Sequence, residues 1–370
     1  MNERRRHVLM TADAVGGVWR YALDLARGLA AHGVRTTLAL AGPEPGAAQR
    51  GEAAGVPGLA LVSPGLALDW TAAEGAEVTA AGERLAALAV ELRPDLVHLN
   101  SPAYAAAARF EAPVLGVAHS CVATWWAAVR GGEAPEDFRW RTELAARGYR
   151  ACGLVLAPSR AFAEATALAY GLPLPVVVHN GRRNLGAGAT AGPGGFAFTA
   201  GRLWDDGKNL GVLDAAAARL ELPVYAAGPA LAPHGDARRF SALRLLGVLD
   251  EAAVAGWLAS RPIFVSTALY EPFGLAVLEA AQAGCALVLS DIPTFRELWD
   301  GAALFVDPRD PAGLARAIAG LSADPARRGR LGSAAAVRAE RFTVEAMTLG
   351  VLSAYARLAP NAFASQEAAA

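Results

Sequence analysis

The feature that most constrains the fold of this chain is the alternation of short apolar runs with longer amphipathic segments. The runs 7–12 (HVLMTA) and 36–42 (TTLALAG) flank an amphipathic segment over Trp19–His32, and this order recurs along the chain. Strands that are apolar throughout are buried on both faces, as in parallel sheets covered by helices. The pattern therefore predicts an α/β protein with doubly wound parallel sheets. The strands predicted in the first half are 7–12, 36–42, 96–100, 112–120 and 153–159.

The segment 179–195 (HNGRRNLGAGATAGPGG) interrupts this rhythm. It is rich in glycine and has no periodic apolar face, which is typical of a linker. A chain of 370 residues favours two domains, so we expect two such units joined near residue 190, with a final helix over 343–359. In these sheets ligands bind at the carboxyl ends of the strands. The strands predicted in the second half are 196–201, 222–228, 244–247, 263–267, 286–290 and 303–307.

Composition excludes several classes of function. The net charge is −1, without the basic excess of a nucleic-acid-binding protein, and this balance allows at most weak peripheral contact with a membrane. No apolar stretch is long enough to predict a membrane span. The three cysteines are far apart and form no CxxC motif, so we expect reduced thiols in a cytoplasmic protein, with no disulfide or zinc site.

The motif GRLWDDGKN (201–209) contains Lys208, the only lysine in the chain. It follows a predicted strand directly, so Arg202 and Lys208 project from the carboxyl end of that strand. An arginine fork and a compact ammonium six residues apart can converge on one multiply charged anion. A surface turn with one leftover lysine is the alternative. We expect Asp205 and Asp206 to cap the turn or to be exposed, and not to bind a metal.

A second motif, EPFGLAVLE, places two carboxylates eight positions apart. Glu271 lies in a predicted loop, whereas Glu279 lies in a helix predicted over Phe273–Gln282, with Pro272 suited to its first turn. The free amides at the start of this helix, around 273–275, favour a phosphate group. Two such carboxylates can contact different parts of one elongated ligand. An acid at the helix start and an unrelated surface acid would be the plainer interpretation.

Together these motifs resemble the retaining GT-B glycosyltransferases of family GT4, the sucrose-synthase and mannosyltransferase group. The resemblance extends to HNG (179–181), to GGVWRYALDLARGLAAHGV near the amino terminus and to RPDLVHLN. It implies two Rossmann-like domains with an interdomain cleft. The acceptor-binding domain would span residues 1–185 and the donor-binding domain residues 190–344, with the helix near 345–359 packing back on the first domain.

The resemblance also implies roles for individual residues. Arg202 and Lys208 would bind the diphosphate of a nucleotide-sugar donor. Glu279 would bind the ribose hydroxyls, and Glu271 would hold hydroxyls of the donor sugar. Loop glycines would let the backbone approach the donor phosphate, and backbone groups after residue 247 would contact the base. The other donor-binding positions implied are Gly16, Gly17, Val248, Leu249, Phe273, Gly274 and Leu275.

In the first domain, His119 matches the histidine that faces the donor sugar in the family. His98 lies within a predicted strand and is expected to be a core residue or to support the site. Trp125 and Trp126 could stack on a sugar acceptor or pack in the interior. The chain has FRELW where many relatives carry a smaller turn, so Glu297 is only a candidate donor contact.

The resemblance implies a metal-independent enzyme without a cofactor. It would move a hexosyl group, with retention, from a nucleoside-diphosphate sugar to a hydroxyl of an unidentified sugar, lipid or small-molecule acceptor. Two alternatives stay open: a non-catalytic GT-B subunit that binds a nucleotide sugar or a partner, and a sugar-nucleotide epimerase of the same architecture. The pairing of E-x7-E with GR…GKN argues against the epimerase.

Overall fold

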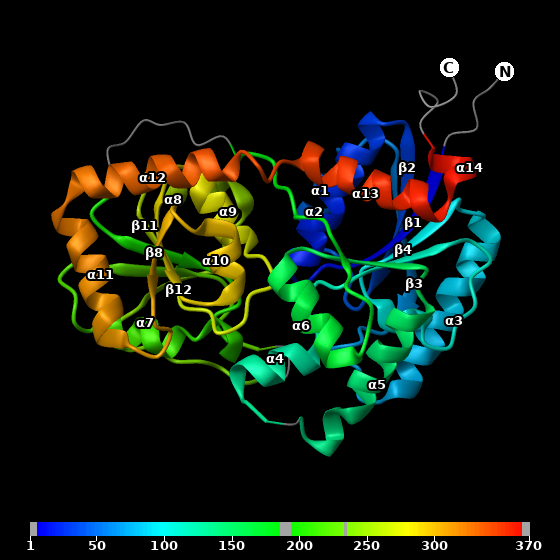
Figure 1. The fold of residues 1–370 in the computed structure, drawn as a ribbon, viewed down its shortest axis with the longest axis horizontal. Helices are drawn as coiled ribbons and strands as arrows, with labels where there is room; N and C mark the ends of the chain where they lie inside the picture. Colours follow the sequence, from blue (N-terminus) through cyan, green and yellow to red (C-terminus); the bar gives the residue numbers. More distant parts are fainter. Residues whose placement is uncertain (1–5, 133, 186–193, 233–234, 365–370) are drawn as a thin grey trace. The chain divides into compact units, whose positions relative to one another are not determined.

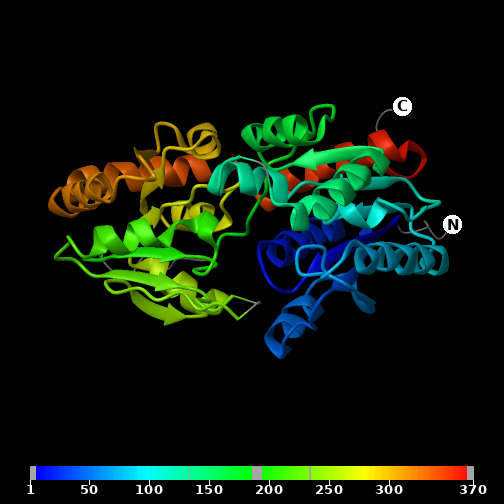
Figure 2. The same cartoon turned by 90° about the horizontal axis from the view of Figure 1, so that it is seen from below.

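The computed structural model describes residues 6–132, 134–185, 194–232 and 235–364. The chain divides into two compact units. The first contains residues 1–127, 131–181 and 344–370, and the second contains residues 128–130 and 182–343. The chain enters the main part of the second unit between Gly181 and Arg182 and returns to the first unit between Thr343 and Val344. Both ends of the described chain, blue and red in Figures 1 and 2, belong to the first unit.

The first unit is built on seven parallel strands in the order β3-β2-β1-β4-β5-β6-β7. Parallel strands need crossover connections, which the intervening helices provide. The strands are β1 (Arg6–Asp13), β2 (Val34–Ala41), β3 (Leu59–Leu66), β4 (Leu96–Leu99), β5 (Val114–Val117), β6 (Leu154–Ala157) and β7 (Val176–Val177).

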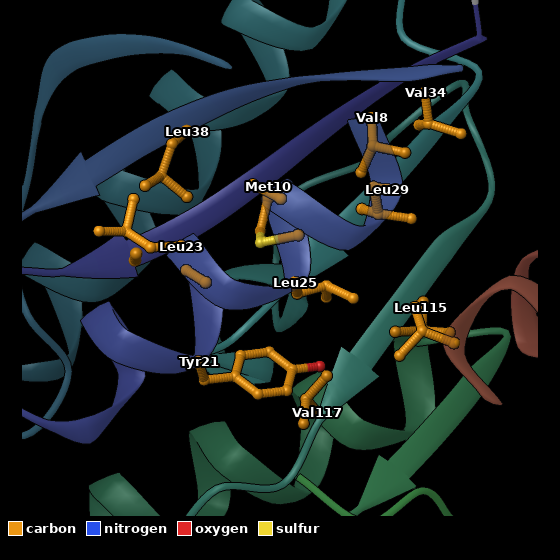
Figure 3. Packing of buried hydrophobic residues seen from close by; sticks show 14 of the residues in the cluster. Val8, Met10, Tyr21, Leu23, Leu25, Leu29, Val34, Leu38, Leu115 and Val117 are labelled. Atoms are coloured by element: carbon orange, nitrogen blue, oxygen red, sulfur yellow. The ribbon is translucent and has the colours of Figure 1, made fainter. Parts of the chain in front are cut away.

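Helices cover both faces of this sheet because successive strand residues point to opposite sides. On β1, Val8 and Met10 face one cluster of buried side chains, whereas Leu9 faces the other. Figure 3 shows Val8 and Met10 directed toward Leu25 and Leu29 of α1. On this face α1 lies beside α13 (Figure 1). The first face is covered by α1 (Gly17–Ala31), α2 (Ala47–Ala54), α13 (Val344–Leu358) and α14 (Pro360–Phe363), and the second by α3 (Gly75–Leu92), η1 (Pro102–Ala105) and α5 (Glu136–Ala151).

The second unit has six parallel strands in the order β10-β9-β8-β11-β12-β13. They are β8 (Ala197–Ala200), β9 (Val224–Ala227), β10 (Arg244–Gly247), β11 (Ile263–Ser266), β12 (Ala286–Ser290) and β13 (Ala303–Val306). One face packs on α7 (Leu210–Ala217) and α11 (Pro311–Ala323), and the other on α8 (Glu251–Ala259), α9 (Leu275–Gln282), α10 (Pro293–Trp299) and α12 (Pro325–Ala339). The elements not yet given are α4 (Val122–Val129), α6 (Arg160–Tyr170) and η2 (Asp206–Lys208).

The doubly wound α/β class is confirmed, and each predicted strand is present with ends shifted by at most a few residues. Two strands at the sheet edges were missed. The interior of β3 contains Pro64 and Gly65, which weaken any strand pattern and are tolerated because an edge strand is hydrogen-bonded on one side only. The other, β7, has only two residues. Residues 186–193 of the predicted linker lie outside the described residues.

Candidate functional site

The loop after β8 holds Arg202 and Lys208 and is fixed by its own acidic residues. The Asp205 carboxylate accepts a hydrogen bond from the Gly207 N–H at 2.8 Å, which caps η2, and it pairs with Arg202 Nη2 at 2.9 Å. Asp206 pairs with Arg238 and Arg130. The expected cap is therefore present at Asp205, and both carboxylates are engaged by cations.

Lys208 and Glu271 lie side by side. The Lys208 ammonium donates to Glu271 Oε2 at 2.5 Å, and the two side chains are 21% and 17% exposed. The structure thus joins two predicted site residues that are 63 positions apart in the sequence. An anion that binds Lys208 has to compete with this carboxylate or displace it.

The backbone of Lys208 is held at the carboxyl ends of three strands. Asn209 adopts a left-handed conformation with φ of 55°, and its side-chain amide donates to the carbonyl oxygens of Thr267 (3.1 Å) and Pro308 (2.7 Å). The Thr267 hydroxyl donates in turn to the Lys208 carbonyl at 3.0 Å. Sequence reasoning missed the role of Asn209, although asparagine is among the few residues that tolerate this backbone conformation. These contacts fix where the lysine side chain starts.

Glu279 is bound by a buried arginine. Arg182 Nε donates to Glu279 Oε1 at 2.7 Å, and Arg182 Nη2 pairs with Glu251. The Arg182 side chain is only 2% exposed, and its backbone carbonyl accepts a hydrogen bond from Gln282 Nε2 at 2.9 Å. A buried charge is stable only when it is paired, so this contact explains how Glu279 occurs among apolar neighbours. Arg182 was missed because it lies in the segment interpreted as a linker.

The helix that carries Glu279 begins later than predicted. Gly274 has φ of 95° and ψ of 68°, a conformation that favours glycine, so α9 begins at Leu275 and Pro272 precedes it. Phe273 is not helical, and its ring packs against Phe342 in the core with centroids 5.5 Å apart. The first helical bond runs from the Leu278 N–H to the Gly274 carbonyl, so the N–H groups without an intrahelical partner are those of residues 274–277.

The two residues predicted to contact the base follow β10. Val248 is 75% exposed, whereas Leu249 is partly buried against the core of the second unit. Asp250 then caps α8, its carboxylate accepting a hydrogen bond from the Ala253 N–H at 2.7 Å. Glu297 is partly buried on α10. The base contacts remain a prediction.

In the first unit, His119 lies two residues beyond β5, which ends at Val117 and not at residue 120 as predicted. Its Nε2 is 2.8 Å from Asn100 Oδ1. Its ring packs edge-on against the ring of Tyr21, with the ring centroids 4.5 Å apart. Burial lowers the pKa of His119 to about 3, so the imidazole is neutral at pH 7. A neutral imidazole has one N–H donor and one acceptor nitrogen, which suits it to bind hydroxyl groups.

The other candidates in the first unit lie at the start of α1 and within α4. Gly16 is the extended residue that precedes α1, and Gly17 is the first residue of that helix, which begins two residues earlier than predicted. Trp125 and Trp126 are partly exposed on α4, with Trp126 packed against Phe138 at 5.4 Å. Their contact with an acceptor remains a prediction.

His98 is wholly buried in β4, and burial lowers its pKa to about 3. In the unfolded chain a histidine has a pKa near 6.5, so between these two values the unfolded state binds more protons and stability falls as the pH falls. We expect the free energy of unfolding, measured with urea, to lose about 2 kcal/mol on this account between pH 7.5 and pH 5. His98→Gln should remove that part of the pH dependence. An unchanged pH dependence in the variant would contradict the lowered pKa.

Among the described residues there is no group of three or more histidine, cysteine or carboxylate side chains able to hold a metal ion. In the same part of the chain, no helix has the length and apolar character needed to span a membrane.

Two family models match the chain in succession: Glycosyltransferase Family 4 over residues 15–182, and Glycosyl transferases group 1 over residues 194–324. A glycogen synthase of Mycobacterium tuberculosis is 40% identical over 103 residues, which are 27% of this chain and 25% of that protein. A phosphatidyl-myo-inositol mannosyltransferase of Mycolicibacterium smegmatis is 34% identical over 116 residues, 30% of each chain. The matches thus span between a quarter and a third of these curated relatives.

Similar solved structures cover almost the whole chain. Sucrose-phosphate synthase from Thermosynechococcus elongatus aligns with a TM-score of 0.76 at 19% identity, covering 96% of this chain and 99% of its own. HepE from Anabaena, solved in complex with UDP and glucose, aligns with a TM-score of 0.71 at 19% identity, covering 95% of this chain and 100% of its own. At these identities the likeness concerns the fold.

Proposed function

Because the chain belongs to glycosyltransferase family 4 and has the GT-B fold, we propose that it transfers a hexosyl group from a nucleoside-diphosphate sugar to an acceptor hydroxyl. The transfer proceeds with retention of anomeric configuration and needs neither a metal ion nor another cofactor. The acceptor is a sugar, a lipid headgroup or a small molecule that carries a free hydroxyl.

The observation that carries this proposal is the fixed placement of the Lys208 ammonium at the carboxyl ends of the strands in the second unit. Its backbone is held by Asn209 and Thr267, and its ammonium is paired with Glu271. A cation that is positioned before the ligand arrives needs no reorganisation when negative charge develops. The loop is thus suited to bind a polyanion such as a diphosphate.

Cleavage of the bond between the anomeric carbon and the diphosphate leaves negative charge on the phosphate oxygens. Lys208 and Arg202 stabilise that charge, together with the free amides at the start of α9. When the donor binds, Lys208 exchanges Glu271 for a phosphate oxygen. The Glu271 carboxylate is then free to accept hydrogen bonds from hydroxyls of the donor sugar, while Glu279 does so for the ribose.

In the retaining reaction the acceptor hydroxyl attacks the anomeric carbon on the face from which the diphosphate departs. The proton of that hydroxyl passes to the departing phosphate oxygen, so no protein carboxylate is needed as the base. This differs from glycosidases, which place two carboxylates about the scissile bond. His119 binds a hydroxyl of the donor sugar as a neutral imidazole.

The proposal of metal independence rests on what the nearby carboxylates already bind. Asp205 is taken up by the Gly207 amide and by Arg202, and Asp206 pairs with Arg238 and Arg130. Divalent magnesium or manganese would need oxygen ligands that these contacts occupy. The two cations of the loop supply the positive charge that a metal ion would bring.

The proposal is tested by thermal-shift screening against UDP-, GDP-, ADP- and TDP-sugars, followed by a nucleotide-release assay with the sugar that stabilises the protein. We expect one class of nucleotide sugar to raise the melting temperature of the protein. Release of the nucleoside diphosphate from that donor should be unaffected by EDTA. The HepE complexes with UDP and UDP-glucose make UDP-glucose the first donor to try. Stabilisation without release or transfer would favour the non-catalytic alternative, and a loss of turnover with EDTA would contradict the mechanism.

A further inference from the structure

Five polar residues at the carboxyl edge of the first sheet form one hydrogen-bonded network, which Thr11 joins through its backbone carbonyl and its hydroxyl. Thr11 comes from β1, His98 and Asn100 from β4 and its end, His119 from the loop after β5, and Tyr355 from α13. Thr11, His98, Asn100 and Tyr355 are buried, whereas His119 is partly exposed. The network therefore leads from the core to a side chain that a ligand can reach.

The orientation of the Asn100 amide is fixed by Thr11. The Asn100 Nδ2 atom lies 2.6 Å from the Thr11 carbonyl oxygen, and a carbonyl can only accept a hydrogen bond. The backbone N–H of Asn100 donates to the Thr11 hydroxyl at 2.9 Å, which holds the two strands together at this point. The amide nitrogen must therefore face Thr11, and the amide oxygen must face the histidines.

The amide oxygen in turn dictates where both imidazoles carry their proton. Asn100 Oδ1 lies 2.8 Å from His119 Nε2 and 3.2 Å from His98 Nε2. An amide oxygen can only accept, so each histidine must donate from Nε2. His98 Nδ1 is then an acceptor, and it receives the Tyr355 hydroxyl proton at 2.7 Å. Burial keeps both imidazoles neutral, because it lowers their pKa values to about 3.

We propose that Asn100 is a positioning residue that holds His119 in the Nε2–H tautomer, so that His119 Nδ1 presents a lone pair to the ligand. Within the described residues His119 Nδ1 makes no hydrogen bond. A group bound there must donate a hydrogen bond, as a hydroxyl does, and a carboxylate or phosphate oxygen is excluded. This inference rests on the proposed function for the identity of the ligand, a hydroxyl of the donor sugar.

The tautomer is measured without any substrate. In protein labelled with ¹⁵N at the histidine rings, and with resonances assigned through His119→Gln and His98→Gln, we expect the one-bond N–H coupling of both residues at Nε2 alone. Asn100→Leu should move the two nitrogen shifts of His119 toward each other, because the ring is then free to exchange. Tyr355→Phe is the matched control, since it removes a partner of His98 and leaves the contact between Asn100 and His119. A wild-type His119 protonated at Nδ1 would overturn the proposal.

Kinetics then separate positioning from a merely structural role. Asn100→Leu should lower kcat/KM about tenfold, the usual worth of one neutral hydrogen bond, and Tyr355→Phe less than threefold. The double variant Asn100→Leu/His119→Ala should be no slower than His119→Ala alone, because Asn100 acts through His119. Additive losses would contradict this.

Donor analogues in which one sugar hydroxyl is replaced by fluorine test the ligand class, because fluorine cannot donate. For the wild type, one analogue should have an affinity at least tenfold lower than that of the parent nucleotide sugar. For His119→Ala, the same analogue and the parent nucleotide sugar should have equal affinities. If the affinity of every analogue relative to the parent nucleotide sugar is the same in His119→Ala as in the wild type, His119 accepts no hydrogen bond from a sugar hydroxyl. If the tautomer is as expected but no nucleotide sugar binds, the proposed function fails and the role of Asn100 in fixing the tautomer stands.

Discussion

Replacing Lys208 with alanine is expected to lower kcat by about 100- to 1000-fold, because it removes one preorganised charge from the departing diphosphate. The folded structure should survive, since the backbone at this position is held by Asn209 and Thr267 and not by the lysine side chain. Lys208→Arg should recover only part of the rate, because a planar fork cannot occupy the place of a compact ammonium. Steady-state rates of nucleotide release, with circular dichroism to check folding, measure both effects.

The matched control for Lys208 is Arg238→Ala. Arg238 is also a cation bound to this loop, through Asp206, but its side chain is 51% exposed. An exposed ion pair contributes little, so kcat should stay within about threefold of the wild type. If both variants lost activity equally, general disturbance of the loop would explain the result, and the role of Lys208 would be refuted.

Arg182→Met is expected to destabilise the second unit by about 3 to 5 kcal/mol. The methionine matches the stem of the arginine but leaves Glu279 and Glu251 without the buried cation, and removing one partner of a buried pair leaves an uncompensated charge. Urea denaturation at pH 7.5, followed by the far-ultraviolet signal, gives the free energy of unfolding. Donor affinity should fall as well, because Glu279 loses the contact that orients it.

Arg183→Met is the control for this second variant. Arg183 is the next residue, also contacts Glu251 and is 43% exposed. Its loss should cost less than about 1 kcal/mol. Equal losses from the two neighbouring variants would show that the burial of Arg182 does not matter.

The fold could be predicted largely from local pattern. The strands of the second unit are short apolar runs, such as residues 263–267 and 286–290, and their burial on both faces leaves a signal in any short window. The edge strand β3 lacks this signal because of Pro64 and Gly65. The start of α9 was misplaced because Gly274 adopts a left-handed conformation that the surrounding sequence does not announce.

The site could be predicted only as separate motifs. Lys208 and Glu271 each stand out in the sequence. Their pairing joins the loop after β8 to the loop after β11, however, and such a contact has no local signature in the sequence. Arg182 was hidden because a glycine-rich context suggested a linker, and its partner Glu279 is 97 residues away. The network through Asn100 also depends on contacts between β1, β4 and α13, which only the tertiary structure brings together.

The central claim is that Lys208 recognises the diphosphate of the donor, and calorimetric titration with a nucleoside diphosphate and its monophosphate tests it most directly. UDP and UMP serve as the pair, or the corresponding pair for the base found in the screen. The wild type should bind the diphosphate far more tightly, and Lys208→Ala should reduce the ratio of the two affinities by about 10- to 100-fold, the worth of a charge-assisted hydrogen bond. A ratio that is the same in the wild type and in Lys208→Ala would contradict the account.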